Sequence, residues 1–523
     1  MPRRALPVSV VHGQPIDMRD GTILRADLYR PDDDATHRTV LMRSPYGERT
    51  ARMMPTMPLL EAGLAVVFQH CRGRGDSDGT FAPWVHEGPD GVDTVEWITA
   101  QSWSNGEVVA TGVSYIAGCA LQLAAQRPAA LKAVVATMTP HDFYEGLTYV
   151  GGALALGSAH HWSTLQGLLS LMQTAALGDT TAYERLGAQF ALLGAPPSEQ
   201  GPLREDPVSR EFPFWTEWVD HPERDAYWEE LASSLRHDRI EAPVLHTAGW
   251  FDVFLAGTLE NHRRLGGPLV IGPWTHLSQD AAAGELVFGT PASGQIAGLE
   301  GRQIAHLAGL PDSGPPVRIF VMGANVWRDE QTWPPARAVA TRFHLHPGGL
   351  LSPDAPTADA APTRFPHDPA APVPTHGGGL LLPDPLNIGP RDQRVNAGHP
   401  GIVRFTTPPL DADLEVTGPV TATLHGTTTA PGADWTVKLV DVWPDGREMN
   451  VVDSVRRSTS DTVLHEIDLV ATSQVFQAGH RLRVEIAGSN YPRFDLHPAL
   501  REGEQTLFHD AARPSFITLP VMP

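Results

Sequence analysis

Two patterns of apolar and polar positions alternate along the first 140 residues. Apolar runs bounded by turn residues predict buried strands, and apolar positions at helical spacing predict helices between them. The predicted strands are 40–42, 65–68, 108–111 and 131–137, and the predicted helices are 89–100 and 116–126. Strands that alternate with helices predict a mostly parallel sheet with right-handed crossovers.

The pattern changes between about residues 143 and 240, where β-branched clusters are few and helical spacing dominates over 165–176 and 181–193. The alternation then resumes. Two further strands and an intervening helix are predicted at 243–248, 269–272 and 253–265. A sheet that is interrupted by helices and then continued predicts a cap domain inserted into an α/β domain.

Helical periodicity fades after about residue 340. Residues 354–379 are rich in proline, alanine and glycine, which predicts an irregular crossing loop. Short alternating runs follow, separated by turn signals such as Pro444-Asp445-Gly446. Their spacing predicts a β-sandwich or jelly roll with strands at 401–406, 414–416, 420–425, 435–442, 463–469 and 480–487.

The composition of the 523-residue chain limits the function classes that need consideration. The length predicts two or three domains. A formal net charge of −21 argues against nucleic acid and against a membrane surface as partners, because both attract basic faces. The two cysteines, Cys71 and Cys119, form neither a disulfide framework nor a zinc spacing, and Cys119 is predicted to be a small core residue.

The N-terminal residues carry charge but are not followed by the apolar segment of a secretory signal, and no apolar run approaches the length of a membrane span. We therefore expect a cytoplasmic protein. The sequence does not determine the oligomeric state, and a homodimer stays open.

The segment Thr111–Gly118 has the local pattern of a nucleophile elbow, a tight turn between a strand and a helix. Gly112 supplies the small residue that the turn needs, and Ser114 would stand at the helix N-terminus, where backbone N–H groups favour developing negative charge. The usual second glycine, two positions after the serine, is replaced by Ile116, and the next glycine is Gly118.

A nucleophilic serine needs a base and an acid, which follow it in the order acid then base in α/β-hydrolase folds. Asp252 and His276 come in that order, each just after a predicted strand. An aspartate there could instead cap the helix predicted from Val253. Three other histidines are weaker candidates for the base: His246 lies within a strand and is predicted to be a core residue, and His160 and His161 precede Asp252.

An oxyanion hole requires two hydrogen-bond donors. The backbone N–H of Tyr115 is one expected donor. The loop after the first predicted strand, Arg43–Gly47, lacks a glycine-rich run but offers the phenolic O–H of Tyr46. From chemistry alone, Tyr46 is either that donor or a packed loop aromatic.

Four segments around these residues match one known pattern: Ser44–Gly47, Gly112–Tyr115, Gly249–Asp252 and Val270–His276. With them, the chain resembles the cocaine esterase family, the serine hydrolases that include α-amino acid ester hydrolases, glutaryl-type β-lactam acylases and X-Pro dipeptidyl peptidases. The similarity continues through Cys71–Gly79, Val317–Gly323, Val416–Val420, Lys438–Val442, Pro444–Arg447, Gly479–Arg481 and Ser489–Pro492.

The resemblance implies an α/β fold: an α/β-hydrolase core (1–142 and 241–340), a helical cap (143–240) and a C-terminal jelly-roll domain (341–523). It implies Ser114 as nucleophile, Asp252 as acid and His276 as base, with the Tyr46 hydroxyl and the Tyr115 N–H in the oxyanion hole.

The resemblance assigns Trp162, in the cap, and Phe254, two residues after Asp252, to the acyl pocket, although both could simply pack the cap. Residues 143–150 contain no match to the family's upstream pocket tryptophan.

The reaction expected from these residues is hydrolysis of a small-molecule ester through an acyl-enzyme, without a metal or cofactor. One alternative is amide chemistry, for which a substrate ammonium would need carboxylates such as Asp142, Glu145, Asp220 and Asp225. Another alternative is a non-catalytic protein that binds ligands with its β-domain.

The segment Arg72–Gly79 contains Arg-Gly-Asp and spaced carboxylates but lacks the spacing of a calcium loop. We predict that it is a structural loop, with Arg72 in a local salt bridge.

Overall fold

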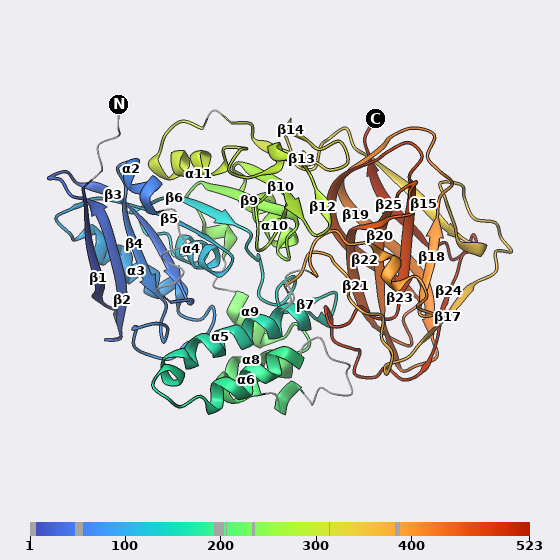
Figure 1. The fold of residues 1–523 in the computed structure, drawn as a ribbon, viewed down its shortest axis with the longest axis horizontal. Helices are drawn as coiled ribbons and strands as arrows, with labels where there is room; N and C mark the ends of the chain where they lie inside the picture. The colour runs from blue at the N-terminus through green and yellow to red at the C-terminus, as the bar shows by residue number, and fades with distance from the viewer. Residues whose placement is uncertain are drawn as a thin grey trace.

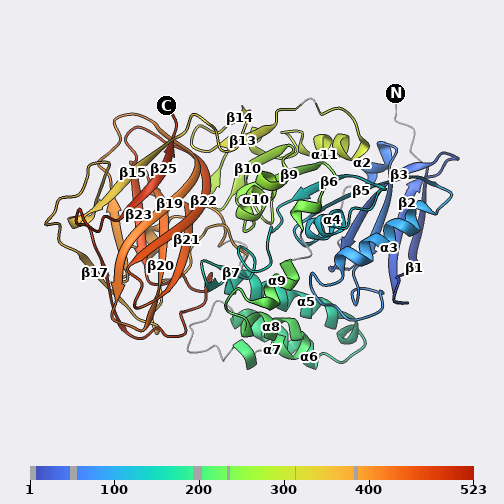
Figure 2. The same cartoon turned by 180° about the vertical axis from the view of Figure 1, so that it is seen from behind.

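The computed structural model describes residues 7–47, 56–192, 203–205, 207–232, 236–312, 314–381 and 387–523. A sheet flanked by helices is built from strands between residues 8 and 330, a group of helices lies below it, and a second sheet structure holds the C-terminal residues (Figure 1). The same three parts are seen from behind in Figure 2. No helix in the described ranges is long and apolar enough to cross a membrane.

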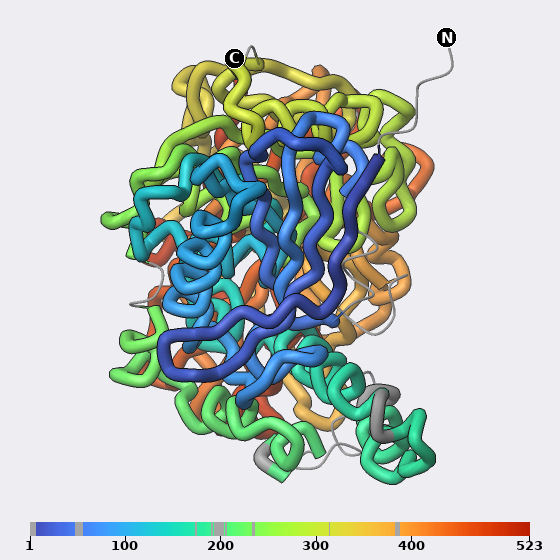
Figure 3. Tube along the Cα trace, turned by 90° about the vertical axis from the view of Figure 1, so that its left-hand side faces the viewer, coloured from blue at the N-terminus to red at the C-terminus, as the bar shows by residue number. Residues whose placement is uncertain are grey.

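The first sheet has ten strands. In spatial order they are β1 (Val8–Asp17), β2 (Ile23–Pro31), β4 (Ala65–His70), β3 (His37–Ser44), β5 (Ser104–Val113), β6 (Leu131–Thr137), β9 (Val244–Phe251), β10 (Leu269–Thr275), β13 (Val317–Val321) and β14 (Val326–Glu330). Neighbours from β4 to β13 pair in parallel, whereas β1, β2 and β14 are antiparallel to their neighbours. The predicted parallel sheet is confirmed, and Figure 3 shows its N-terminal strands in front.

Helices cover this sheet on both faces, which is why its central strands read as continuous apolar runs. In β4, Val66 and Phe68 pack in one cluster with residues of α2 (Thr56–Glu61) and α11 (Leu299–Ala308), while Val67 packs in the opposite cluster with α3 (Glu87–Thr99) and α4 (Tyr115–Ala125). The helix α10 (Leu255–Leu265) connects β9 to β10.

The predicted helical insertion lies between β6 and β9. After a short hairpin, β7 (Tyr149–Val150) and β8 (Ala153–Leu154), come α5 (Leu156–Ala176), α6 (Thr181–Leu192), α7 (Pro207–Glu211), α8 (Pro213–Asp220) and α9 (Ala226–Ala232). Helix α5 begins earlier than predicted, because polar residues such as His160, Ser163 and Thr164 are buried in its first turns and hide the helical period. The domain limits predicted from the sequence stay a prediction.

The C-terminal part is a β-sandwich around one apolar core. Its strands are β15 (Val339–His346), β16 (Leu350–Ser352), β17 (Thr363–His367), β18 (Ile402–Thr406), β19 (Leu414–Thr428), β20 (Gly432–Val442), β21 (Glu448–Thr459), β22 (Leu464–Phe476), β23 (Arg481–Ala487), β24 (Gly503–Leu507) and β25 (Phe516–Val521). A small hairpin, β11 (Ala282–Ala283) and β12 (Leu286–Val287), precedes it.

Two predictions for this part are wrong in detail. Runs 414–416 and 420–425 form one strand, β19, whose register with β22 shifts between Pro419 and Thr421. The stretch 354–379 is not wholly irregular, because it contains β17, which pairs antiparallel with β24. That strand is short and carries proline, so its composition resembles a loop.

The β-sandwich is joined to the hydrolase sheet by backbone hydrogen bonds. The N–H of Met322, just after β13, donates to Ser473 at 3.0 Å, and the Val475 N–H donates to Met322 at 2.8 Å. A second segment of the sandwich reaches the ends of the parallel strands, where Gly379 lies against the backbone of Asp252.

Candidate active site

Ser114 has the strained backbone that a nucleophile elbow requires. Its φ of 62° and ψ of −127° are rare for a residue with a side chain, and it occupies the cap position of α4. The turn is fixed from both sides. The Ser114 N–H donates to Thr137 at 3.0 Å, and the Thr139 hydroxyl donates to the Ser114 carbonyl at 3.1 Å.

Two glycines make room around this elbow for different reasons. A Cβ on Gly112 would lie 2.3 Å from Ile116 Cγ2. Ile116 occupies the position where the usual elbow has its second glycine, and this larger side chain fits only because residue 112 is a glycine. A Cβ on Gly118 would lie 2.5 Å from Trp84 Cζ3. Gly118, the glycine found four residues after the serine, therefore makes room for the Trp84 ring to pack on α4.

Asp252 and His276 are brought together at the ends of β9 and β10. His276 Nδ1 lies 2.7 Å from Asp252 Oδ1, and because a carboxylate only accepts, the imidazole donates. The Asp252 side chain is fully buried and that of His276 is 7% exposed. The alternative that Asp252 caps the following helix is wrong, since Phe254 holds the cap position and no side chain caps α10.

Tyr46 follows β3 and places its hydroxyl beside Ser114. The indole N–H of Trp162 donates to the Tyr46 hydroxyl oxygen at 3.1 Å, which leaves the Tyr46 proton free to point elsewhere. Burial raises the pKa of Tyr46 to about 12, although hydrogen bonds with Trp162 and Ser114 act in the opposite direction. Tyr46 is therefore a protonated donor over the ordinary pH range.

Tyr115 contributes more than its backbone N–H. Its buried hydroxyl donates to Glu87 Oε1 at 2.7 Å and accepts from the backbone N–H of Trp84 at 3.1 Å. Burial, and then the negative charge of Glu87, raise its pKa well above the ordinary value for tyrosine. Its ring forms part of the wall of the cavity at Ser114.

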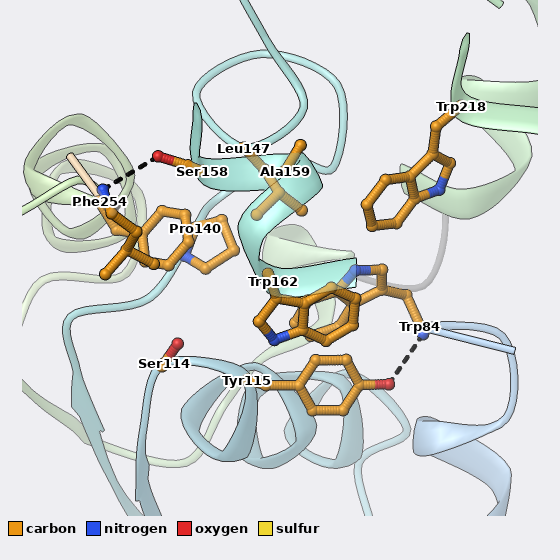
Figure 4. A pocket seen from close by; sticks show the side chains of 11 residues that line it. Trp84, Ser114, Tyr115, Pro140, Leu147, Ser158, Ala159, Trp162, Trp218 and Phe254 are labelled. Carbon is orange, nitrogen blue, oxygen red and sulfur yellow. Dashed lines mark hydrogen bonds between the residues drawn. The ribbon is translucent and has the colours of Figure 1, made fainter. Parts of the chain in front are cut away.

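A mostly apolar cavity opens beside Ser114 (Figure 4). Its other lining residues are Trp84, Tyr115, Pro140, Leu147, Ser158, Ala159, Trp162, Trp218, Phe254 and Leu381. Aromatic rings stack along one side, with centroids 3.9 Å apart for Trp84 and Tyr115, 5.7 Å for Tyr115 and Trp162, and 6.0 Å for Trp162 and Trp218. Phe254 meets the His276 ring edge-on with the ring centroids 5.2 Å apart, which connects His276 to this cavity.

The sequence did not predict seven of the lining residues: Trp84, Pro140, Leu147, Ser158, Ala159, Trp218 and Leu381. Three of them show where such residues come from. Trp84 comes from the loop before α3, and Gly118 was the signal that a large side chain lies against α4. Trp218 comes from α8. It is a second tryptophan of the cap in the cavity wall, whereas residues 143–150 contain none. Leu381 comes from the β-sandwich segment, where its N–H donates to Ser158 Oγ at 3.1 Å.

Three of the four candidate carboxylates for ammonium recognition have other partners. Asp142 pairs with Arg224, and Asp225 pairs with His221. Glu145 accepts from the Gly151 N–H at 3.1 Å. Among the described residues that line the cavity, none is a carboxylate.

The other predictions for single residues have clear outcomes. His246 is a core histidine: its Nε2 meets the Gly266 carbonyl at 3.0 Å, and burial lowers its pKa to about 3. His161 is also mostly buried, which lowers its pKa to about 4. Arg72 forms the predicted local salt bridges, to Asp20 and to Asp90, both at 2.7 Å.

Cys71 and Cys119 are both buried and free, which confirms the prediction that Cys119 is a core residue. Their sulfur atoms and a Glu87 oxygen lie within 4.8 Å of one another, and this is the one group of potential metal ligands in the described residues. Glu87 is already paired with Arg43 at 2.9 Å, so its charge is compensated without a metal.

The sequence also matches known protein families and relatives. Residues 20–278 match the model of X-Pro dipeptidyl-peptidase (S15 family), and residues 308–518 match that of the X-Pro dipeptidyl-peptidase C-terminal non-catalytic domain. The chain is 34% identical to the cocaine esterase of Rhodococcus sp. (strain MB1 Bresler), over 93% of this chain and 92% of that protein. The chain belongs to the cocaine esterase-like family of S15 serine hydrolases.

Solved structures show the same fold over the whole chain of this S15 family member. An aminopeptidase from a marine sediment Thaumarchaeota archaeon has a TM-score of 0.83 at 23% identity, covering 100% of this chain and 99% of that one. An α-amino acid ester hydrolase has a TM-score of 0.80 at 22% identity, covering 100% and 98%. The esterase relative and the family match show that the protein is a serine-type ester hydrolase, and the solved structures show an α/β-hydrolase core with a C-terminal β-domain.

Proposed function

We propose that Ser114, His276 and Asp252 form the catalytic triad and that they hydrolyse a carboxylic ester with an apolar acyl group. The observation that carries this proposal is the buried Asp252–His276 pair, 2.7 Å apart, at the sheet edge where Ser114 stands in a strained turn. Phe254 contacts the His276 ring and lines the cavity together with Ser114.

The reaction follows from the donors and acceptors. Ser114 Oγ attacks the carbonyl carbon while His276 Nε2 takes its proton, and Asp252 stabilises the imidazolium that results. The Tyr46 hydroxyl and the Tyr115 N–H donate to the oxyanion. Collapse expels the alcohol, which receives the proton from His276. Water then attacks the acyl-enzyme with His276 again as base, releasing the carboxylic acid and restoring Ser114.

The cavity favours an acyl group that is flat and apolar. Tryptophan, tyrosine and phenylalanine rings line it, and such surfaces gain most from stacking with an unsaturated or aromatic group. The similarity to an esterase fits ester cleavage. Amide cleavage stays an alternative, because one structural neighbour is an aminopeptidase, but the described lining offers no carboxylate for a substrate ammonium.

The test has two parts. A fluorophosphonate probe should label Ser114, and Ser114→Ala should lose both labelling and turnover while keeping the wild-type melting temperature. Rates should then be compared for p-nitrophenyl acetate, butyrate and benzoate, for amino acid esters and for an X-Pro anilide. Retained turnover in Ser114→Ala would refute the triad, and a preference for the anilide would favour the amide alternative.

The acyl preference can be tested at one residue. Trp218→Ala should shift the preference toward longer acyl groups, because it removes a ring from the cavity wall without touching Ser114. Trp97→Ala is a matched control, since this tryptophan lies on α3 and is not part of the described lining.

A cytoplasmic location stays a prediction, and the oligomeric state stays open. Light scattering of the purified protein decides whether it is a homodimer.

A further inference from the structure

A buried ion pair joins β3 to α3, and neither of its residues lines the cavity. Arg43 of β3 and Glu87 of α3 are 2.9 Å apart, and their side chains are only 2% and 3% exposed. Arg43 Nη1 also donates to the Glu87 backbone carbonyl at 2.5 Å, and Arg43 Nε donates to Gln69 at 2.7 Å. Burial by itself would lower the pKa of Arg43, but the charge of Glu87 raises it above the ordinary value. The guanidinium therefore stays charged.

Glu87 is bonded to two segments that are far apart in the sequence. One carboxylate oxygen faces Arg43, three residues before Tyr46 in the same chain segment. The other accepts the hydroxyl of Tyr115, the residue directly after Ser114. These two segments carry the two groups proposed to donate to the oxyanion.

Stability alone does not account for this pair. A buried ion pair gains little over apolar residues of similar volume, because removing two charges from water is costly. The ion pair and its neighbours do, however, fix the positions of Tyr115 and Trp84. Three contacts converge on the Tyr115 hydroxyl and Trp84: Glu87 accepts from Tyr115, Tyr115 accepts from the Trp84 N–H, and Gln122 donates to the Trp84 carbonyl at 2.7 Å.

We propose that Glu87 is a positioning residue for the oxyanion hole, which holds the Tyr46 segment through Arg43 and the start of α4 through Tyr115. This inference rests on the proposed function of Ser114 and Tyr46. Glu87 would then affect the rate of acyl transfer without contacting the substrate.

The test is Glu87→Gln. The amide oxygen can still accept from Tyr115, but the amide N–H groups would face the Arg43 guanidinium and push that segment away. We expect kcat per titrated active site to fall by about 10- to 100-fold, as for a misplacement on the order of 1 Å, with KM nearly unchanged. The dissociation constant of an arylboronic acid, which forms a tetrahedral adduct with the serine, should rise by the same factor.

Asp93→Asn is the matched control. Asp93 lies on the same helix and is paired with Arg19 at 2.6 Å, so the variant also removes a carboxylate from an ion pair, but one that contacts neither Arg43 nor Tyr115. It should change the melting temperature without changing kcat or boronic acid affinity. A purely structural role for Glu87 would give the same result in both variants.

Tyr115→Phe provides a second route if Glu87→Gln fails to fold. It keeps the Arg43–Glu87 pair and the Tyr115 backbone N–H but removes the bonded hydroxyl, and it should lower kcat and boronic acid affinity together. Wild-type kcat and wild-type boronic acid affinity in the folded Glu87→Gln and Tyr115→Phe variants would overturn the inference. Failure of the proposed function would be seen separately, as turnover by Ser114→Ala.

Discussion

The indole N–H of Trp162 donates a hydrogen bond to the hydroxyl oxygen of Tyr46 at 3.1 Å. This contact joins the cap helix α5 to the loop after β3. Because one side of the Tyr46 oxygen is occupied, its proton is available for an oxyanion at Ser114. Trp162, which the resemblance assigns to the acyl pocket, therefore also contacts the tyrosine that we propose as an oxyanion donor.

The first prediction tests that contact. Trp162→Phe keeps a ring in the wall but loses the N–H, and it should lower kcat about fivefold, the equivalent of about 1 kcal/mol for one neutral hydrogen bond. Tyr46→Phe should cost about 10²- to 10³-fold. In the Tyr46→Phe background, Trp162→Phe should have no further effect on kcat. Equal effects of Trp162→Phe in both backgrounds would show that Trp162 acts only through the pocket.

The second prediction concerns Asp252. Asp252→Asn should lower kcat by about 10⁴-fold, because an amide can no longer fix the histidine tautomer with a proton on Nδ1. Steady-state rates at saturating p-nitrophenyl ester measure this. The β-domain provides a control of the same chemistry: His480 Nδ1 lies 2.8 Å from the buried Asp441. Asp441→Asn should leave kcat at the wild-type level, and a comparable loss there would point to a general structural effect.

The sequence predicted the parts of the site that depend on local pattern and chain order. The turn between strand and helix points to Ser114, and the positions directly after two strands point to Asp252 and His276. These three depend on parallel strands ending at one edge, which a pattern of apolar runs already implies.

The partners that pack from other parts of the chain were not predictable in the same way. Trp84 has a φ of 70° in a loop, Trp218 lies on a short cap helix, and Leu381 arrives from the β-sandwich. No period or spacing connects them to Ser114, because their positions are set by tertiary packing. Only Gly118 gave a local signal, as the small residue against which Trp84 packs.

The third prediction concerns alkaline pH. An ordinary tyrosine with a pKa of about 10 would be half ionised at pH 10 and would then repel an oxyanion. Burial raises the pKa of Tyr46 to about 12, so loss of the donor moves to higher pH. The kcat for an alkyl ester, measured by pH-stat titration, should therefore stay level between about pH 8 and 10.5. A decline with a midpoint near pH 10 that disappears in Tyr46→Phe would contradict this.

The fourth prediction concerns the glycine of α4. Alanine is normally favoured over glycine in a helix by about 1 kcal/mol, but a Cβ on Gly118 would lie 2.5 Å from Trp84 Cζ3. Trp84 cannot easily move away, since its backbone N–H and carbonyl are both bonded, to Tyr115 and Gln122. Gly118→Ala should therefore reduce the free energy of unfolding by about 1–3 kcal/mol, as overpacking does.

A smaller ring should relieve that clash. Trp84→Phe removes the outer atoms of the indole, so Gly118→Ala should cost less in the Trp84→Phe background than in the wild type, as measured by urea denaturation of the four proteins. Gly301 in α11 is the matched control, because a Cβ there meets nothing within 4 Å. Gly301→Ala should be neutral or stabilising. If Gly118→Ala is equally harmless, the displaced glycine of the elbow has no packing role and its position needs another explanation.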